Sequence, residues 1–144
     1  MVTDARIAEY ESVVAGVRKW AESQANIVAV GVVGSWASGN QHDDSDLDFV
    51  VLTPQKTSYT ASDGWIEDAV GQSVPVVRRA EWGVLTERRL KLPSGLEIEV
   101  GFVEPSWAAT DPTNPGTAEV VGDGGLLPVY DPDGVLKPFA AATT

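Results

Sequence analysis

The sequence predicts an α+β fold in which a mixed β-sheet carries its helices on one side. Three observations predict it: an amphipathic helix pattern at the N-terminus, two apolar strand patterns separated by a short polar segment, and a meander of three further strand patterns. The length of 144 residues and the hydrophobic content of 43% suit one ordinary core. We therefore expect residues 1–144 to form a single domain.

The first expected elements are a helix and a strand. Thr3 or Asp4 can cap a helix that ends near residues 23–24, because apolar residues then recur at intervals of three and four: Ile7, Tyr10, Val14, Val17 and Ala21. Residues 27–33 form a continuous apolar run, which predicts a buried strand. Gly34-Ser35 ends this run, and residues 36–39 are long enough for one helical turn.

The middle of the chain predicts a second buried strand, a helix and a meander. The second strand covers residues 47–53 and ends at Pro54, and a short helix is expected at residues 62–70. Turn signals then separate three strands at residues 74–81, 85–92 and 96–103, of which the last two form a hairpin.

The rest of the chain is rich in Pro, Gly and Asp. We interpret Val120-Val121 and residues 126–130 as short strands or loops at the edge of the sheet. Residues 131–134 are typical of a turn, and residues 135–141 favour a last helical turn.

Composition excludes several classes of function. Asp and Glu number 21 against 10 Lys and Arg, a formal charge of −11, so non-specific binding to nucleic acid is not expected. The chain has no cysteine, which excludes disulfides, thiolate catalysis and zinc–thiolate sites. No signal peptide or membrane-spanning segment is evident, so we expect a soluble cytoplasmic protein without a membrane partner.

Asp46 and Asp48 are the first candidate metal ligands. They are two residues apart on an expected strand, so both side chains leave one face, while Leu47 and Phe49 point to the other. Two such carboxylates repel each other unless a cation lies between them, and sites rich in oxygen suit Mg²⁺ or Mn²⁺. An isolated Asp-X-Asp is more often a solvated turn, so the pair gains meaning only from its surroundings.

Gly34 and Ser35 are candidate phosphate-binding residues. Glycine lets the backbone approach an anion closely, and the following amides and the serine hydroxyl can donate to phosphate oxygens. A lone Gly-Ser is usually an ordinary turn. The informative pattern is the whole order: apolar strand, Gly-Ser, residues 36–45, Asp-X-Asp, apolar strand.

With Gly34, Ser35, Asp46 and Asp48 in this order, the segment resembles the signature of small bacterial nucleotidyltransferases of the DNA polymerase β-like superfamily. The resemblance implies a nucleotidyltransferase-like core and a metal-dependent transferase that binds ATP or another nucleoside triphosphate. Such an enzyme moves a nucleoside monophosphate to an acceptor hydroxyl and releases pyrophosphate. It implies Mg²⁺ or Mn²⁺ as the cofactor, held by Asp46, Asp48 and a third acid on a later strand.

The third acid is expected in residues 96–102, where Glu97 and Glu99 share one strand face. We favour Glu99, because Gly101 beyond it should leave open space over the sheet, and Glu97 is the alternative. The family more often has Asp at this place. A solvent-exposed hairpin face would give the same alternation.

Half of the Lys and Arg residues lie between residues 78 and 91. Arg89 and Lys91 share one strand face and are candidates for contact with the nucleotide's phosphates. Pairing of these basic side chains with Glu87, Glu97 or Glu99 across the hairpin is the more ordinary interpretation.

The acceptor is open: a small molecule, a protein or a tRNA end. Larger members of the superfamily hold the acceptor with an extra domain, so a homodimer or a partner chain could complete the site here. The alternative function is a non-catalytic or weakly active nucleotide-binding, antitoxin-like partner module.

Overall fold

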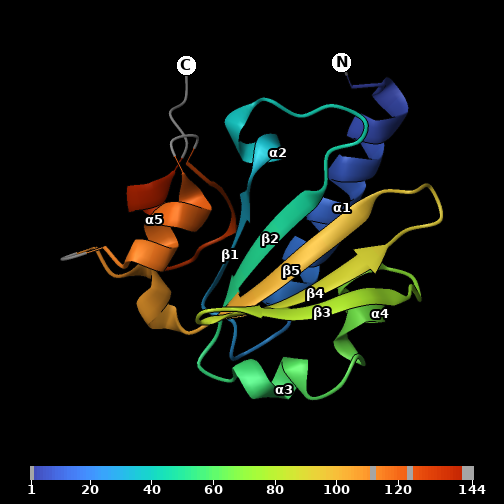
Figure 1. The fold of residues 1–144 in the computed structure, drawn as a ribbon. Coiled ribbons are helices and arrows are strands. Elements are labelled where there is room, and N and C mark those ends of the chain that lie inside the picture. Colours follow the sequence, from blue (N-terminus) through green and yellow to red (C-terminus); the bar gives the residue numbers. More distant parts are fainter. Residues whose placement is uncertain (1, 111–112, 123–124, 141–144) are drawn as a thin grey trace.

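A single six-stranded mixed sheet organises the computed structural model, which describes residues 2–110, 113–122 and 125–140 (Figure 1). The strands lie in the order β3-β4-β5-β2-β1-β6. The pairing of β2 with β5 is parallel and the other neighbours are antiparallel. The strands are β1 Ala29–Val33, β2 Leu47–Leu52, β3 Val76–Trp82, β4 Leu85–Lys91, β5 Glu97–Val103 and β6 Leu127–Tyr130. The expected α+β class with a mixed sheet is confirmed.

The helices pack mainly on one face of this sheet. Figure 1 shows α1 and α4 behind the strands, with α3 at the lower edge. The α-helices are α1 Asp4–Glu22, α2 Ser35–Ser38, α3 Lys56–Thr60, α4 Trp65–Val70 and α5 Pro115–Val121, and the 3₁₀ helices are η1 Pro105–Ala108 and η2 Lys137–Phe139.

The helix α1 begins as expected, with the Thr3 hydroxyl accepting from the Arg6 amide at 3.2 Å. Its buried residues are Val13, Val17, Trp20 and Ala21, whereas Ile7 remains 38% exposed. The expected apolar face of the helix was therefore right for Val17 and Ala21 and wrong for Ile7. Burial concentrates in the second half of α1, which packs on α4 and the sheet.

An aromatic cluster joins the helices to the sheet. Tyr59 of α3 stacks on Phe102 of β5 with ring centroids 5.4 Å apart, and Trp65 of α4 meets the same ring edge-on at 5.1 Å. Trp20 of α1 lies against Trp65 at 5.7 Å. These contacts also explain α3, which the sequence did not indicate: Thr and Ser are weak helix formers, and burial of Tyr59 holds the turn in place.

The opposite face of the sheet is covered in part by the C-terminal segment. Leu126, Leu136 and Trp107 are buried in a second cluster with Val50 and Leu52 of β2. Val120-Val121, expected as a strand or loop, ends α5 instead, which begins at Pro115 in a favoured first position. β6 is the expected edge strand, and it pairs with β1. The last helical turn is η2, and Ala141 lies outside the described residues.

Candidate active site

The parallel pairing of β2 with β5 brings three acidic side chains together. Asp48 lies beside Glu99 in the register, and Asp46 directly precedes β2 on the same face. One carboxylate oxygen of each residue lies within 4.8 Å of the other two, and all three residues are half-buried. The set that the sequence proposed is thus assembled at one point, with Glu99 and not Glu97 in the cluster.

The reason given for Glu99 was wrong, although the residue is the one in the cluster. Open space was expected over Gly101, but Leu85 of β4 leans over this glycine. A Cβ at position 101 would lie 2.8 Å from Leu85 Cδ1. Glu99 joins the cluster because of its register with Asp48, which only strand pairing determines.

Gly34 lies at the corner between β1 and α2, directly against Asp48. Its φ is +79°, a conformation that favours glycine, and a Cβ would lie 2.6 Å from Asp48 Oδ2. Ser35 follows as the first residue of α2 and is half-buried. The expected Gly-Ser corner and the Asp-X-Asp strand therefore meet at one side of the carboxylate cluster.

Asp48 is an electrostatically strained member of this cluster. Burial, followed by the neighbouring charge of Asp46, raises the pKa of Asp48 to about 6. Its Oδ1 is buried and has no hydrogen-bond partner among the residues that the structure describes. An unpaired buried carboxylate oxygen is costly, and a hard cation is the natural partner for it.

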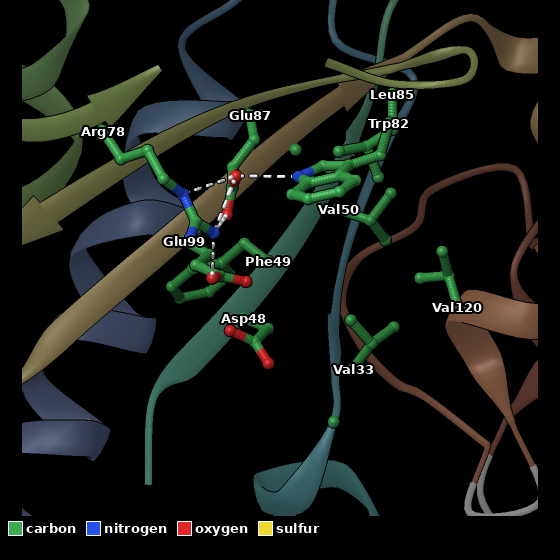
Figure 2. Close-up of a pocket in the computed structure, with 12 residues that line it drawn as sticks. Val33, Asp48, Phe49, Val50, Arg78, Trp82, Leu85, Glu87, Glu99 and Val120 are labelled. Atoms are coloured by element: carbon green, nitrogen blue, oxygen red, sulfur yellow. Dashed lines mark hydrogen bonds and ion pairs between the residues drawn. The ribbon is translucent and has the colours of Figure 1, made fainter. Parts of the chain in front are cut away.

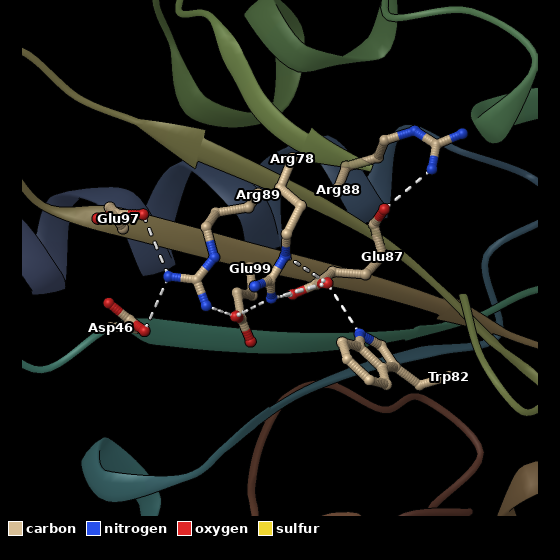
Figure 3. Close-up of polar contacts among 8 residues, drawn as sticks. All are labelled: Asp46, Arg78, Trp82, Glu87, Arg88, Arg89, Glu97 and Glu99. Atoms are coloured by element: carbon tan, nitrogen blue, oxygen red, sulfur yellow. Dashed lines mark hydrogen bonds and ion pairs between the residues drawn. The ribbon is translucent and has the colours of Figure 1, made fainter. Parts of the chain in front are cut away.

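Arg89 pairs with two of the three cluster carboxylates, Asp46 and Glu99 (Figure 3). Its Nη1 lies 3.0 Å from Asp46 Oδ2 and 3.1 Å from Glu97 Oε1, and its Nη2 contacts Glu99. Burial opposes the charged guanidinium, but hydrogen bonds to Glu97 and Asp46 outweigh it and raise the pKa of Arg89 above its usual range. The contacts with Glu97 and Glu99 agree with the ordinary interpretation, in which the basic side chains pair across the hairpin.

The other basic residues take different positions. Lys91 is exposed at the end of β4, opposite Glu97. Arg88 lies on the helix-facing side, where its Nη2 donates to the Thr60 carbonyl at 2.8 Å. Arg89 and Lys91 thus share the cluster face, as the strand period predicted, and Arg88 is part of the core.

Three residues of this face were not singled out as site residues: Arg78, Trp82 and Glu87. Glu87 is only 3% exposed, and it accepts from Arg78 Nη2 at 2.7 Å and from Trp82 Nε1 at 2.9 Å. Burial disfavours its charge, but these bonds hold the pKa of Glu87 below its usual range. The available signal was the period of two in β4, which places Glu87 on the face of Arg89.

A cavity of about 360 Å³ lies over this face of the sheet (Figure 2). Its polar wall contains Asp48, Glu99, Glu87 and Arg78, and its apolar wall is formed by Val33, Val50, Trp82, Leu85 and Val120. The carboxylate cluster therefore opens into a space large enough for a small ligand that is polar at one end and apolar at the other.

Comparison with protein families finds a match over residues 15–101, more than half of the chain, to the model of the nucleotidyltransferase domain. This range contains all the site residues that the sequence suggested. A search of curated protein sequences found no significant match.

Solved structures with the same fold include Cid1 poly(U) polymerase with Mg and 3'-dATP bound, at 17% identity and a TM-score of 0.53. A cytoplasmic RNA terminal U-transferase matches at 17% identity and a TM-score of 0.51. The matches cover 70% of this chain but only 32% and 30% of those proteins. At these identities the likeness concerns the fold, and the chain spans about a third of the length of its structural relatives.

Proposed function

The chain belongs to the nucleotidyltransferase domain family, and on this premise we propose that it transfers a nucleoside monophosphate from a nucleoside triphosphate to an acceptor hydroxyl and releases pyrophosphate. The family makes it a transferase. The observation that carries the specific reaction is the meeting of Asp46, Asp48 and Glu99 within 4.8 Å, beside the Gly34 corner.

The residues present fit a divalent cation such as Mg²⁺ or Mn²⁺. The donor set is entirely carboxylate oxygen, which these ions prefer, and Asp48 Oδ1 is buried without a partner among the described residues. Asp46, Asp48 and Glu99 would hold the metal. When bound, it would neutralise phosphate charge and polarise the α-phosphate.

The chain's own residues would position the two reactants. The Gly34–Ser35 corner would bind the β- and γ-phosphates through backbone amides and the serine hydroxyl. Glu99 would take the proton of the acceptor hydroxyl as its oxygen forms a bond to the α-phosphorus. The bond from the α-phosphorus to the bridging oxygen breaks, and pyrophosphate leaves with the electron pair. Positioning and charge neutralisation would supply most of the catalysis.

Arg89 has a defined place in this proposal. Its guanidinium contacts Asp46 and Glu99, so it would compete with a metal for these two carboxylates. Once displaced, it would lie on the correct face to contact a phosphate of the nucleotide, together with Lys91.

The same contacts favour one alternative, a non-catalytic partner module. The Arg89 guanidinium already neutralises charge on Asp46 and Glu99, so these two carboxylates are paired without a metal. Nucleotide binding that does not respond to a divalent cation would support this alternative.

The acceptor remains a small molecule, a protein or a tRNA end. The matches cover only about a third of the polymerase structures, so a second copy or a partner chain could hold the acceptor. Residence in the cytoplasm remains a prediction. No helix within the described residues combines the length and apolar character that crossing a bilayer requires.

The test is nucleotide binding with and without metal, followed by transfer of label. Equilibrium dialysis with each of four nucleoside triphosphates should detect binding with Mg²⁺ or Mn²⁺ and little binding with a chelator. Asp48→Asn should abolish the metal dependence. Asp44→Asn, which removes an exposed loop carboxylate, is the matched control and should behave as wild type.

An α-phosphate radiolabel should then pass from the preferred nucleotide into one component of a cell extract, whose digestion by nuclease or protease identifies its class. Equal nucleotide binding with metal and with chelator would contradict the proposal, as would the absence of transfer with every nucleotide.

A further inference from the structure

Trp82 is an exposed aromatic side chain that is nonetheless held in one orientation. It is 61% exposed at the end of β3, yet its Nε1 donates to Glu87 Oε2 at 2.9 Å. Glu87 is buried, and the Arg78 guanidinium lies 5.9 Å from the centre of the indole ring. Exposed tryptophans are usually free to rotate, so a ring fixed by a buried carboxylate is prepared for contact with another molecule.

The ring belongs to the same network as the carboxylate cluster. Arg78 Nη2 bonds Glu87 at 2.7 Å and Glu99 at 3.2 Å, so Trp82, Glu87, Arg78 and Glu99 form one chain of contacts (Figure 3). Only Glu87 and Arg78 separate the indole from a proposed metal ligand. The ring also lines the same cavity as Asp48 and Glu99 of the cluster.

Along β2 and β5 the lining of the cavity changes from carboxylates to apolar residues, whereas Glu87, opposite Gly101, keeps a charge on the β4 side. Asp48 and Glu99 lie side by side in the sheet, and two residues further along these strands come Val50 and Gly101. Leu85 covers Gly101 and lies opposite Trp82 in the β3–β4 pairing. Figure 2 shows Trp82 and Leu85 on the side of the cavity away from Asp48, with Glu87 beside the indole.

A second cavity of about 860 Å³ continues from this apolar end. It shares Trp82, Leu85 and Val120 with the first cavity, so Trp82 lies where the two meet. A planar group bound against the indole would thus have room beyond it.

We propose that Trp82 binds the base of the nucleoside triphosphate by stacking, while the phosphates lie at the carboxylate cluster. This assignment rests on the proposed function and adds the residue that recognises the base. Stacking depends on the area of overlap, so purine triphosphates should bind more tightly than pyrimidine triphosphates.

The experiment compares nucleotides with inorganic triphosphate, which lacks a base. Binding to the full chain is measured by calorimetry with Mg²⁺, using α,β-methylene nucleotides that cannot react. Trp82→Leu should weaken binding of the purine nucleotides about tenfold or more and leave binding of inorganic triphosphate unchanged. Trp82→Phe, which retains an aromatic face, should lose much less.

Fluorescence gives an independent readout of the same contact. Purine nucleotides should quench tryptophan emission of the wild type, inorganic triphosphate should not, and Trp82→Phe should bind nucleotide without that quenching. Val77→Ala removes another exposed side chain of β3 and should match wild type in every assay.

Equal nucleotide affinity in Trp82→Leu and wild type would overturn the assignment while leaving the proposed function intact. Loss of both nucleotide and inorganic triphosphate binding in Trp82→Leu would also overturn it, because the residue would then support the phosphate site. If the wild type binds neither ligand, the proposed function itself is wrong.

Discussion

At the scale of single residues, Asp48 lowers the stability of the fold but suits a binding site. Its carboxylate is buried against Gly34 and next to Asp46, and one oxygen has no partner among the described residues. Core positions normally satisfy such groups. A site for a cation has the opposite requirement, because oxygens paired within the protein are unavailable to a metal.

The raised pKa of Asp48 predicts that the free energy of unfolding depends on pH. The pKa of Asp48 is raised from 3.8 to about 6, so the folded protein holds this proton more tightly than the unfolded chain does. The resulting stability is fully present below pH 3.8 and is lost as the pH rises through about 6. Without metal, Asp48→Asn should therefore raise the free energy of unfolding at neutral pH by about 1–3 kcal/mol, and by little near pH 4.

Urea unfolding between about pH 4 and pH 8, in the presence of a chelator, measures this difference. Adding Mg²⁺ at neutral pH should stabilise the wild type and leave Asp48→Asn unchanged. Asp44→Asn should follow the wild type throughout. Parallel pH profiles for Asp48→Asn and wild type would show that Asp48 is not strained.

The ion pairs of Arg89 predict that its guanidinium and a divalent cation compete for Asp46 and Glu99. Arg89→Met removes the guanidinium that competes for Asp46 and Glu99, so Mn²⁺ should bind about tenfold more tightly without nucleotide. Binding of inorganic triphosphate with Mg²⁺ should become weaker, because a phosphate contact is lost.

Electron paramagnetic resonance of free Mn²⁺ measures the first effect. Lys91→Met, which removes an exposed charge from the same strand face, is the matched control and should change Mn²⁺ affinity far less. A loss of Mn²⁺ affinity in Arg89→Met would mean that Arg89 organises the carboxylates for metal instead of competing with it.

At the scale of elements, the C-terminal segment is part of the core. Leu126 and Leu136 are fully buried, and both approach Gly31 of β1: a Cβ there would lie 2.3 Å from Leu126 Cδ1 and 3.3 Å from Leu136 Cδ1. Gly31 thus makes room for side chains that arrive from about a hundred residues later in the sequence. This packing covers part of the sheet beside the cavity that contains the carboxylates.

Leu136→Ala should accordingly lower the free energy of unfolding by about 2–5 kcal/mol, through lost burial and the cavity that remains. Denaturant unfolding at one pH tests this. Val84→Ala, at a position that is 65% exposed, should change stability by less than about 0.5 kcal/mol. Wild-type stability in Leu136→Ala would show that the segment is not packed as described.

At the scale of the whole molecule, the charge of −11 opposes the proposed substrate. A free triphosphate is repelled by the protein's field, and salt screens that repulsion. Without divalent cation, nucleotide binding should therefore be weak and should improve as potassium chloride is added. With Mg²⁺ the ligand carries less charge, and the salt dependence should flatten.

Calorimetry at low and high ionic strength, with Mg²⁺ or with chelator, checks this expectation. Inorganic triphosphate should show the same pattern, since the field acts on phosphate charge and not on the base. Nucleotide binding that falls steeply with salt would indicate a basic phosphate site stronger than the acidic field.

Local patterns in the sequence were sufficient for most elements and for naming the three acids that the structure brings together. The Gly-Ser break and the Asp-X-Asp strand start are features of neighbouring residues, and the strand period alone places Arg89 and Lys91 on one face. α3 and α5 were missed or misassigned because tertiary contacts, such as Tyr59 on Phe102, hold them. Their intrinsic propensities are too weak to indicate them.

The sequence by itself determined which residues could act: two aspartates on one strand face, a glycine corner before them, and a later strand with glutamates at every second position. Only the tertiary structure decided which glutamate lies beside Asp48, that Arg89 contacts the cluster, and that Glu87 holds Trp82 over the cavity. The physical reason is that side-chain direction follows from the local strand period, whereas proximity between strands depends on register, which pairing and packing of the whole sheet determine.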